Sequence, residues 1–253
     1  MTGRPLALAS LLPVAVISLC AGAHAAPLRK LGTWEGDDKD SGPTRARKAR
    51  DNKLTEVKQL FAAAKVTFPP RQLLLRAFKR DKELEVWASS REGEALAHVA
   101  TYEICRLSGS LGPKKKEGDW QVPEGFYAID HYKDKSDYYL ALRVSYPNRR
   151  DRQLRHTGSA IMIHGRCVSI GCLAMTDERI QELWVMATAV RALGKVVHVH
   201  LYPTRDLAKL IASTSDAELK SFWGNLKEGI DRFDKQHKLL NVTVDKQGRY
   251  LFR

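Results

Sequence analysis

Cysteine is scarce in this chain: only four occur among 253 residues, and no two of them are spaced as a C-x2-C pair. Structural zinc sites usually draw their ligands from such tight pairs, so the spacing argues against a zinc-binding module. The sequence has no internal repeat, no low-complexity tract and, after residue 25, no apolar run long enough to cross a bilayer. It also lacks a basic helix interleaved with aromatic residues. Nucleic acid is therefore not expected as a partner, although the formal net charge is +13.

The first 25 residues have the pattern of a Sec-type signal peptide. Arg4 supplies a positive charge, residues 6–23 are free of charge and mostly apolar, and Ala23-His24-Ala25 gives a small-x-small cleavage site. A permanent N-terminal anchor remains the alternative. We predict an exported, periplasmic protein whose mature chain has no integral membrane segment. Because cleavage removes only one charge, the mature chain stays strongly basic, which suits anionic wall polymers or membrane surfaces.

Cleavage also removes one cysteine and leaves Cys105, Cys167 and Cys172. Three cysteines in an oxidising compartment form at most one internal bridge and leave one thiol. Cys167 can pair with Cys172, which would make the stretch a structural staple. It can equally pair with Cys105, and Cys172 would then be a free thiol. The sequence leaves both pairings open.

Composition and periodicity divide the chain into four parts. Residues 1–25 form the signal peptide, and 26–52 are polar and predict a flexible linker. Residues 53–95 predict a helix and strands that pack on a larger domain, residues 96–253. That domain alternates short strand-like segments with helical ones, including a helix after Thr176. The pattern predicts an α+β fold.

Residues 161–175, IMIHGRCVSIGCLAM, bring together a histidine and two cysteines, side chains that can bind a metal or act in catalysis. A metal site would join His164, Cys167 and Cys172 to His198 and His200, which alternate on one predicted strand and share a face. Their spacing is poor for zinc, and the last two are more simply half-buried strand residues. We therefore predict no metal. A disulfide corner and a nucleophilic site are the other two interpretations.

The nucleophilic interpretation assigns a role to each residue. Cys172 lies just before a predicted helix, whose dipole and N–H groups would favour a thiolate. Gly171 leaves room for an acyl substrate, and the N–H groups of Gly171 and Cys172 can bind an oxyanion. His164 can act as the base, and the carbonyl of Gly165 can hold its ring. Met175 and Trp184 are predicted to be core residues beneath this loop.

The motif I-x-I-H-G followed by S-x-G-C resembles the signature of the YkuD-type L,D-transpeptidase family. The longer string HGRCVSIGCLAMTD resembles its YafK-like branch, as do SGSLGPKKKEGDWQVPEGFYAI, SYPNRRDR, FWGNLKEGIDRF and GRYLF. The resemblance covers most of residues 100–253. It implies an exported cysteine acyltransferase that acts on peptidoglycan stem peptides. It also implies a β-rich mixed sandwich with peripheral helices in residues 96–253, and no metal or organic cofactor.

Carried over by position, the resemblance makes Cys172 the nucleophile and His164 the base. Ser169 and Gly171 would shape the loop around the thiol, and Gly165 would orient the histidine. Residues 108–124 and 146–157 form basic loops that are candidates for substrate binding. From these loops and their surroundings, Arg166, Tyr146 and Asn148 are the candidate substrate-binding residues.

Two positions depart from the wider family pattern: Ile170 replaces a histidine, and Ala174 replaces an arginine or asparagine. Both departures fit the YafK-like branch, which includes an amidase that cuts the bond joining an outer-membrane lipoprotein to the wall peptide. The expected function is therefore L,D-transpeptidation of stem peptides in cell-wall remodelling. The alternatives are a hydrolytic murein-lipoprotein amidase, with a wall-linked lipoprotein as partner, and a non-enzymatic wall-binding protein.

Overall fold

The computed structural model describes residues 39–253. The predicted signal peptide and residues 26–38 of the predicted linker lie outside the described residues. The helices are α1 (Gly42–Ala63), α2 (Arg149–Gln153), α3 (Asp177–Ala192), α4 (Leu207–Ser213) and α5 (Ala217–Gln236). The strands are β1 (Gln72–Phe78), β2 (Glu83–Ser89), β3 (Ala97–Glu103), β4 (Gly125–Ser136), β5 (Tyr139–Val144), β6 (Met162–His164), β7 (Leu173–Ala174), β8 (Val197–Tyr202), β9 (Val242–Val244) and β10 (Tyr250–Phe252).

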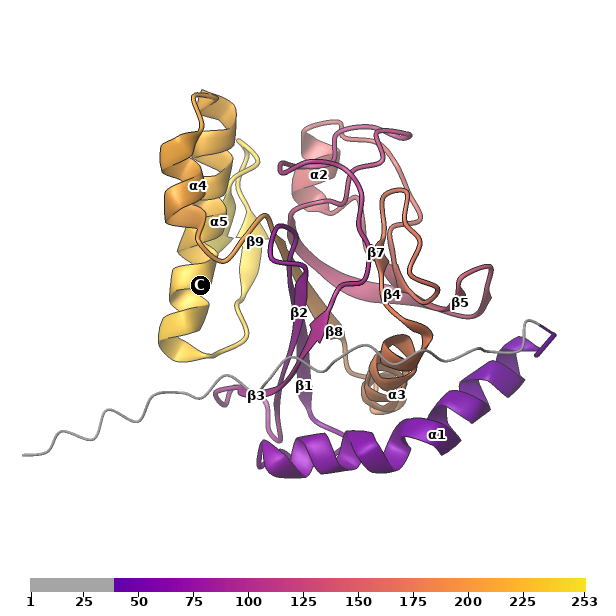
Figure 1. The fold of residues 1–253 in the computed structure, drawn as a ribbon. Coiled ribbons are helices and arrows are strands. Elements are labelled where there is room, and N and C mark those ends of the chain that lie inside the picture. The colour runs from indigo at the N-terminus through magenta and orange to yellow at the C-terminus, as the bar shows by residue number, and fades with distance from the viewer. Residues whose placement is uncertain (1–38) are drawn as a thin grey trace, which may run out of the picture.

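The strands confirm the α+β class. Eight of them form one curled mixed sheet in the order β3-β2-β1-β8-β4-β5-β6-β7, and β9 and β10 form a separate hairpin. The pairs β1–β8 and β6–β7 are parallel, and the other neighbours in the large sheet are antiparallel. Helices α1 and α3 cover one face of the sheet, and α4 and α5 lie on the opposite side (Figure 1).

Helix α1 begins earlier than the sequence predicts and includes residues 42–52, which were predicted to belong to a flexible linker. Ser41 caps it by accepting a hydrogen bond from the Thr44 N–H. Arg45 is buried and donates to the carbonyl oxygens of Ser136 and Tyr139 at 2.8 and 3.1 Å. Residues 42–52 carry many charges, which favoured the prediction of a flexible linker over that of a helix. The sheet beneath it thus supplies acceptors for a buried arginine.

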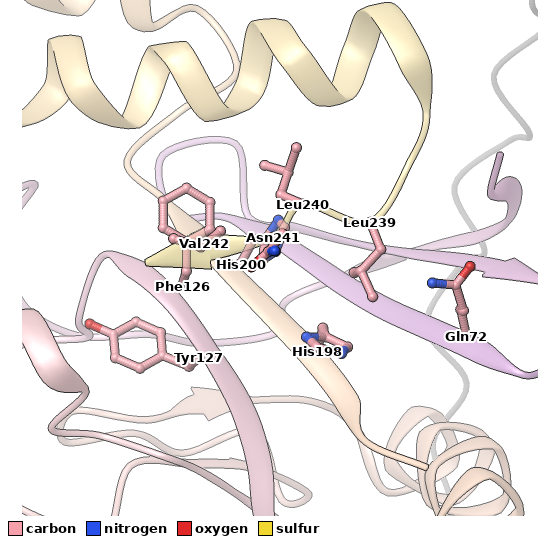
Figure 2. Close-up of a pocket in the computed structure, with 9 residues that line it drawn as sticks. All are labelled: Gln72, Phe126, Tyr127, His198, His200, Leu239, Leu240, Asn241 and Val242. Carbon is pink, nitrogen blue, oxygen red and sulfur yellow. The ribbon is translucent and has the colours of Figure 1, made fainter. Parts of the chain in front are cut away.

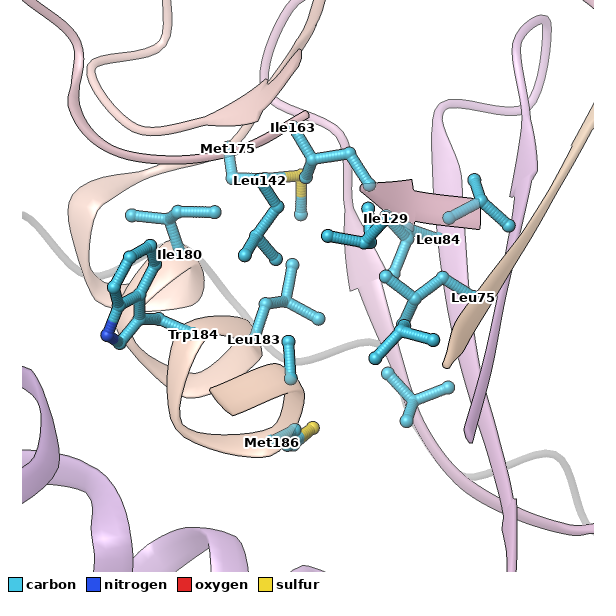
Figure 3. Packing of buried hydrophobic residues seen from close by; sticks show 14 of the residues in the cluster. Leu75, Leu84, Ile129, Leu142, Ile163, Met175, Ile180, Leu183, Trp184 and Met186 are labelled. Atoms are coloured by element: carbon cyan, nitrogen blue, oxygen red, sulfur yellow. The ribbon is translucent and has the colours of Figure 1, made fainter. Parts of the chain in front are cut away.

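The main core lies between α3 and the sheet (Figure 3). Met175 and Trp184 are buried, at 0% and 5% exposure, as the sequence predicts. They pack with apolar side chains of the strands, including Leu142 and Ile163. Burial of such side chains stabilises the fold by about 1.5–3 kcal/mol each.

Helix α3 starts directly after the cysteine loop and fixes one end of it. Thr176 caps the helix by accepting from the Arg179 N–H, and Gly194 follows its end with a φ of +67°. The start of this helix matches the sequence prediction of a helix after Thr176. Within residues 39–253, no helix combines the length and hydropathy needed to span a membrane.

Candidate active site

The pairing of two short parallel strands brings the segments of Cys172 and His164 together. Strand β6 ends in His164 and pairs with β7 so that His164 lies opposite Ala174. Cys172 directly precedes β7. The base and the thiol therefore come from two segments that the β6–β7 pairing places side by side.

The ring of His164 is held in a defined orientation. It is 1% exposed, and its Nδ1 lies 2.7 Å from the carbonyl oxygen of Gly165. A carbonyl only accepts, so Nδ1 carries the proton and the lone pair lies on Nε2. Burial lowers the pKa of His164 below its ordinary value of 6.5. The ring of Tyr138 lies 4.6 Å away, centroid to centroid. The result is a neutral, fixed imidazole at neutral pH.

Gly165 is required by its surroundings. A Cβ at this position would overlap the Oδ1 atom of Asp177 and lie 3.1 Å from the carbonyl oxygen of Tyr138. The same Asp177 oxygen accepts the N–H of Arg166 at 2.7 Å. The first turn of α3 thus packs directly against the backbone that orients His164.

Cys172 is the free cysteine among the described residues. Its Sγ donates to the carbonyl oxygen of Ala160 at 3.6 Å. Burial raises the pKa of the thiol above its ordinary value of 9.0, although the backbone of Met162 and the cation of Lys114 oppose the rise. Burial outweighs these two favourable contributions and opposes the thiolate that the helix position favours.

Ser169 and Cys172 hold each other by two hydrogen bonds. The N–H of Cys172 donates to Ser169 Oγ at 3.0 Å, and that hydroxyl donates to the Cys172 carbonyl oxygen at 2.7 Å. The N–H of Cys172 therefore has an internal acceptor, which differs from the expected role in binding an oxyanion. Ser169 shapes the loop as predicted, and Gly171 adopts a φ of +116° beside it.

A disulfide joins Cys105 to Cys167, with a Cα–Cα distance of 5.3 Å. Of the two pairings that the sequence left open, this one leaves Cys172 free. Next to the disulfide, Arg106 and Ala174 exchange backbone hydrogen bonds of 3.2 and 2.9 Å. The segment after β3 is therefore attached to both ends of the cysteine loop.

The metal ligands considered from sequence are not brought together. Cys167 is bonded to another cysteine, and His198 and His200 line a cavity of about 440 Å³ beside the segment that follows α5 (Figure 2). Burial lowers the pKa of both histidines. In another place, carboxylates of Glu56, Glu178 and Glu182 converge within the described residues. A cation is already present there, because Lys53 Nζ lies 2.9, 3.0 and 3.8 Å from the three carboxylates.

Comparison with known proteins agrees with this geometry. The model of the YkuD L,D-transpeptidase catalytic domain matches residues 72–199, a range that includes His164 and Cys172. The chain is also 37% identical, over 180 residues, to the Escherichia coli K12 protein named "Putative L,D-transpeptidase YafK". That alignment covers 70% of this chain and 72% of the relative. The chain belongs to the YkuD L,D-transpeptidase family.

Two solved structures resemble this YkuD-type chain more distantly. The helical cell shape determining protein Pgp2 from Campylobacter jejuni is 18% identical, with a TM-score of 0.44, over 77% of this chain and 80% of that one. A point mutant of the same protein is 22% identical, with a TM-score of 0.45, over 64% of this chain. In that comparison the match spans just over half, 56%, of the Pgp2 chain.

Two of the predicted substrate-binding residues, Tyr146 and Asn148, make hydrogen bonds within the protein. Tyr146 is buried, and its hydroxyl donates toward the carbonyl oxygens of Lys114 and Thr157, each at 3.2 Å. Asn148 caps α2, and its Nδ2 donates to the Phe126 carbonyl and the Tyr250 hydroxyl. Both side chains stabilise the loop of residues 146–157 from within. Arg166 has a φ of +66° and stays at the exposed edge of the cysteine loop.

The backbone of Trp120 lies close to Gly171 in the cysteine loop, a contact that the sequence did not predict. A Cβ on Gly171 would lie 3.7 Å from the Trp120 carbonyl carbon. Trp120 has a φ of +52°, is 65% exposed, and accepts a hydrogen bond from Ser108 Oγ at its carbonyl. Val168 and Ile170, on the cysteine loop, are 46% and 71% exposed. We call Trp120, Val168 and Ile170 the apolar rim.

An internal ion pair braces the loop that carries Trp120. Lys114 Nζ lies 2.5 Å from Asp119 Oδ1 and 2.9 Å from the Lys116 carbonyl oxygen. Burial alone would raise the pKa of Asp119, but the bonds from Lys114 and backbone N–H groups lower it to about 2. The tripeptide Gly118-Asp119-Trp120 was a usable signal, because an aspartate between turn residues often binds its own backbone.

Proposed function

We propose that this protein is an exported cysteine acyltransferase that acts on peptidoglycan stem peptides through a thioester on Cys172. One observation carries the proposal: the free thiol of Cys172 directly precedes β7, the strand paired with the end of β6 at His164, whose ring is fixed by the Gly165 carbonyl. Family membership supports the reaction class. The assignment of Cys172 and His164 is supported by the general requirement of thiol catalysis for an adjacent, oriented base.

The proposed reaction begins with proton transfer from the Cys172 thiol to Nε2 of His164. Sulfur attacks an amide carbonyl carbon of the donor stem peptide, and the carbonyl oxygen becomes an oxyanion. The N–H of Gly171 is the proposed donor to that oxyanion. The imidazolium then protonates the departing amine, the C–N bond breaks, and a thioester remains.

The acceptor decides the outcome of the second half-reaction. An amine from another stem peptide yields a new amide and a free thiol, which is transpeptidation. Water yields a carboxylic acid and a free thiol, which is hydrolysis. His164 takes the proton of either acceptor, so the same two residues support both reactions. No step requires a metal or an organic cofactor.

A second candidate function is the hydrolytic release of a covalently attached outer-membrane lipoprotein, and the apolar rim favours it. Stem peptides offer small and charged groups, whereas a linked polypeptide brings apolar side chains near the scissile amide. Three exposed large apolar side chains beside a catalytic loop are typical of a protein-binding surface. In this function the leaving amine is a lysine of the lipoprotein.

Both functions place the protein in the periplasm. The signal-peptide pattern of residues 1–25 and the basic charge of the chain support export to an anionic wall. A non-enzymatic wall-binding role is the remaining alternative. It predicts that a Cys172→Ala variant fully restores a deletion strain, whereas an enzyme predicts no restoration.

Mass spectrometry of wall fragments tests the proposal. The purified mature protein is incubated with lipoprotein-linked and lipoprotein-free murein fragments. New cross-linked or amine-exchanged products indicate a transpeptidase, and release of free muropeptide from the linked fragments indicates an amidase. Cys172→Ala must abolish either activity. If neither substrate changes and no acyl adduct forms on Cys172, the proposed function is wrong.

A further inference from the structure

A cavity of about 420 Å³ lies between α1, α3 and the segment that leads to β1. It sits against the C-terminal half of α3, whereas the Cys172 loop precedes the N-terminal end of that helix. The two helices pack side by side beneath the sheet (Figure 1). We call this cavity the interhelical groove. Its volume falls within the range of small-molecule sites, roughly 300–1,000 Å³.

The side chains of the two helices explain why the groove is open. Helix α3 contributes the small residues Thr188, Ala189 and Ala192 to its wall. Helix α1 buries a stripe that includes Ala49, Val57 and Phe61 against its neighbours. The adjacent stripe of α1, at a spacing of four residues, faces the groove and consists of Arg50, Leu54 and Lys58.

The α3 wall of the groove is apolar, and its one hydroxyl already has an acceptor. The hydroxyl of Thr188 donates to the Trp184 carbonyl oxygen at 2.7 Å. The remaining side chains from α3 and the following turn are aliphatic, and Phe68 and Pro69 close the other side. A peptide in this groove would bury backbone N–H and C=O groups without partners, which is costly. An unbranched hydrocarbon chain has no such groups.

Two cations flank the apolar walls. Arg50 and Lys58 are exposed, and within residues 39–253 neither side chain makes an ion pair or a hydrogen bond. By contrast, Lys48 and Lys53 of the same helix are paired with acidic side chains. Arginine and lysine at the edge of an apolar groove can cover it with their aliphatic stems and bind an anion with their heads.

From this arrangement we propose that the interhelical groove binds an anionic single-chain amphiphile. The acyl chain lies along the small residues of α3, and the carboxylate or phosphate head lies between Arg50 and Lys58. The site is separate from the proposed catalytic function, because none of its lining residues belongs to the cysteine loop. The expected occupant is a free single-chain amphiphile.

Fluorescence titration with cis-parinaric acid tests the site, and its methyl ester serves as the uncharged probe. The mature protein is expected to bind the acid saturably, with one site and at least about tenfold more tightly than the ester. Arg50→Glu/Lys58→Glu should weaken binding of the acid about tenfold or more and leave the ester unchanged. The matched control Lys209→Glu/Lys220→Glu changes the same charge at exposed positions of α4 and α5 and should have no effect.

Filling the groove provides the second arm. Ala192→Trp alters an exposed position and is expected to fold normally while it abolishes binding of both probes. Ala189→Phe repeats the test from a deeper position, and the melting temperature of each variant is measured. Cys172→Ala should bind as the wild type does, so this test is independent of catalysis.

Absence of saturable binding by the wild type would overturn the proposal. Equal weakening by the control pair would also overturn it, because binding would then reflect net charge alone. Unchanged binding by a folded Ala192→Trp variant would place the ligand elsewhere. Tighter binding of an acidic amphipathic peptide than of the fatty acid would show that the groove is a protein-docking site.

Discussion

His164 Nδ1 and the carbonyl oxygen of Gly165 lie 2.7 Å apart, so the backbone of Gly165 orients the imidazole ring of the residue before it. The bond fixes both the ring plane and the tautomer and leaves the lone pair on Nε2, the atom available to act as a base. Asp177 and the Tyr138 carbonyl crowd the α-carbon of Gly165, so that this bond depends on the absence of a side chain.

Replacement of His164 by asparagine should slow thioester formation by about 10²–10⁴-fold, because the base is lost while a hydrogen-bonding side chain remains. Single-turnover acylation with a stem-peptide donor measures the effect. Thermal unfolding serves as the control, because His164 is buried against Tyr138 and a larger truncation would also disturb packing. A folded variant with full activity would contradict the proposed base.

The thiol and imidazole should behave as a neutral pair across the neutral range. Burial lowers the pKa of His164 below 6.5 and raises that of Cys172 above 9.0. Acylation should therefore fall only as pH decreases below 6.5, where His164 gains a proton, and stay level up to at least 9.0. Iodoacetamide alkylation of Cys172 should rise with an apparent pKa above 9.0. A midpoint near neutral pH would instead indicate a preformed ion pair.

Loss of the Cys105–Cys167 disulfide should reduce both stability and activity. The bridge closes a sequence separation of 62 residues, so the Cys105→Ala/Cys167→Ala variant should lose about 2–4 kcal/mol of unfolding free energy. Because the bridge also positions the cysteine loop, acylation should decline under conditions where the variant is still folded. Wild-type protein with and without reductant provides the control, and Cys172 should stay the titratable thiol.

Two tryptophans give a matched pair of substitutions. Trp184→Ala removes a side chain that is 5% exposed and should cost about 3–5 kcal/mol of unfolding free energy. Trp120→Ala removes one that is 65% exposed and should leave stability within about 0.5 kcal/mol. If the apolar rim contacts a linked polypeptide, Trp120→Ala should raise KM for lipoprotein-linked fragments and not for free muropeptides. An equal effect on both substrates would assign Trp120 to the stem peptide.

Much of the local structure was readable from the sequence because it depends on neighbouring residues. Residues 53–95 predict a helix and strands, which the structure has as the end of α1 followed by β1 and β2, and Thr176 marks the start of α3. The beginning of α1 was not readable, since its buried Arg45 finds its acceptors in β4 and the first residue of β5, about ninety positions away. The charges in residues 42–52 indicated a segment exposed to solvent. In the structure, Arg45 is buried because tertiary contacts supply acceptors for it.

The same division applies to the candidate site. The identities of Cys172, His164, Ser169 and Gly165 come from a short motif, because local backbone geometry places them together. The disulfide partner, the position of Trp120 over Gly171 and the balance of pKa values required the fold. Burial is a property of the assembled molecule, and here it raises the pKa of the Cys172 thiol, against the effect expected from its position before a helix.

The sequence by itself determined the family, the α+β class and the residues of the proposed thiol–imidazole pair. Tertiary structure decided which cysteine of residues 39–253 is free and which polar side chains support the loops. It also decided where small residues of α3 leave a groove beside Arg50 and Lys58, two cations without an ion-pair partner in the described part of the chain. The physical reason is the sequence separation of the interacting residues. A motif reflects interactions between residues that are close in the chain. Charge pairing, burial and cavities depend on residues that only folding brings together.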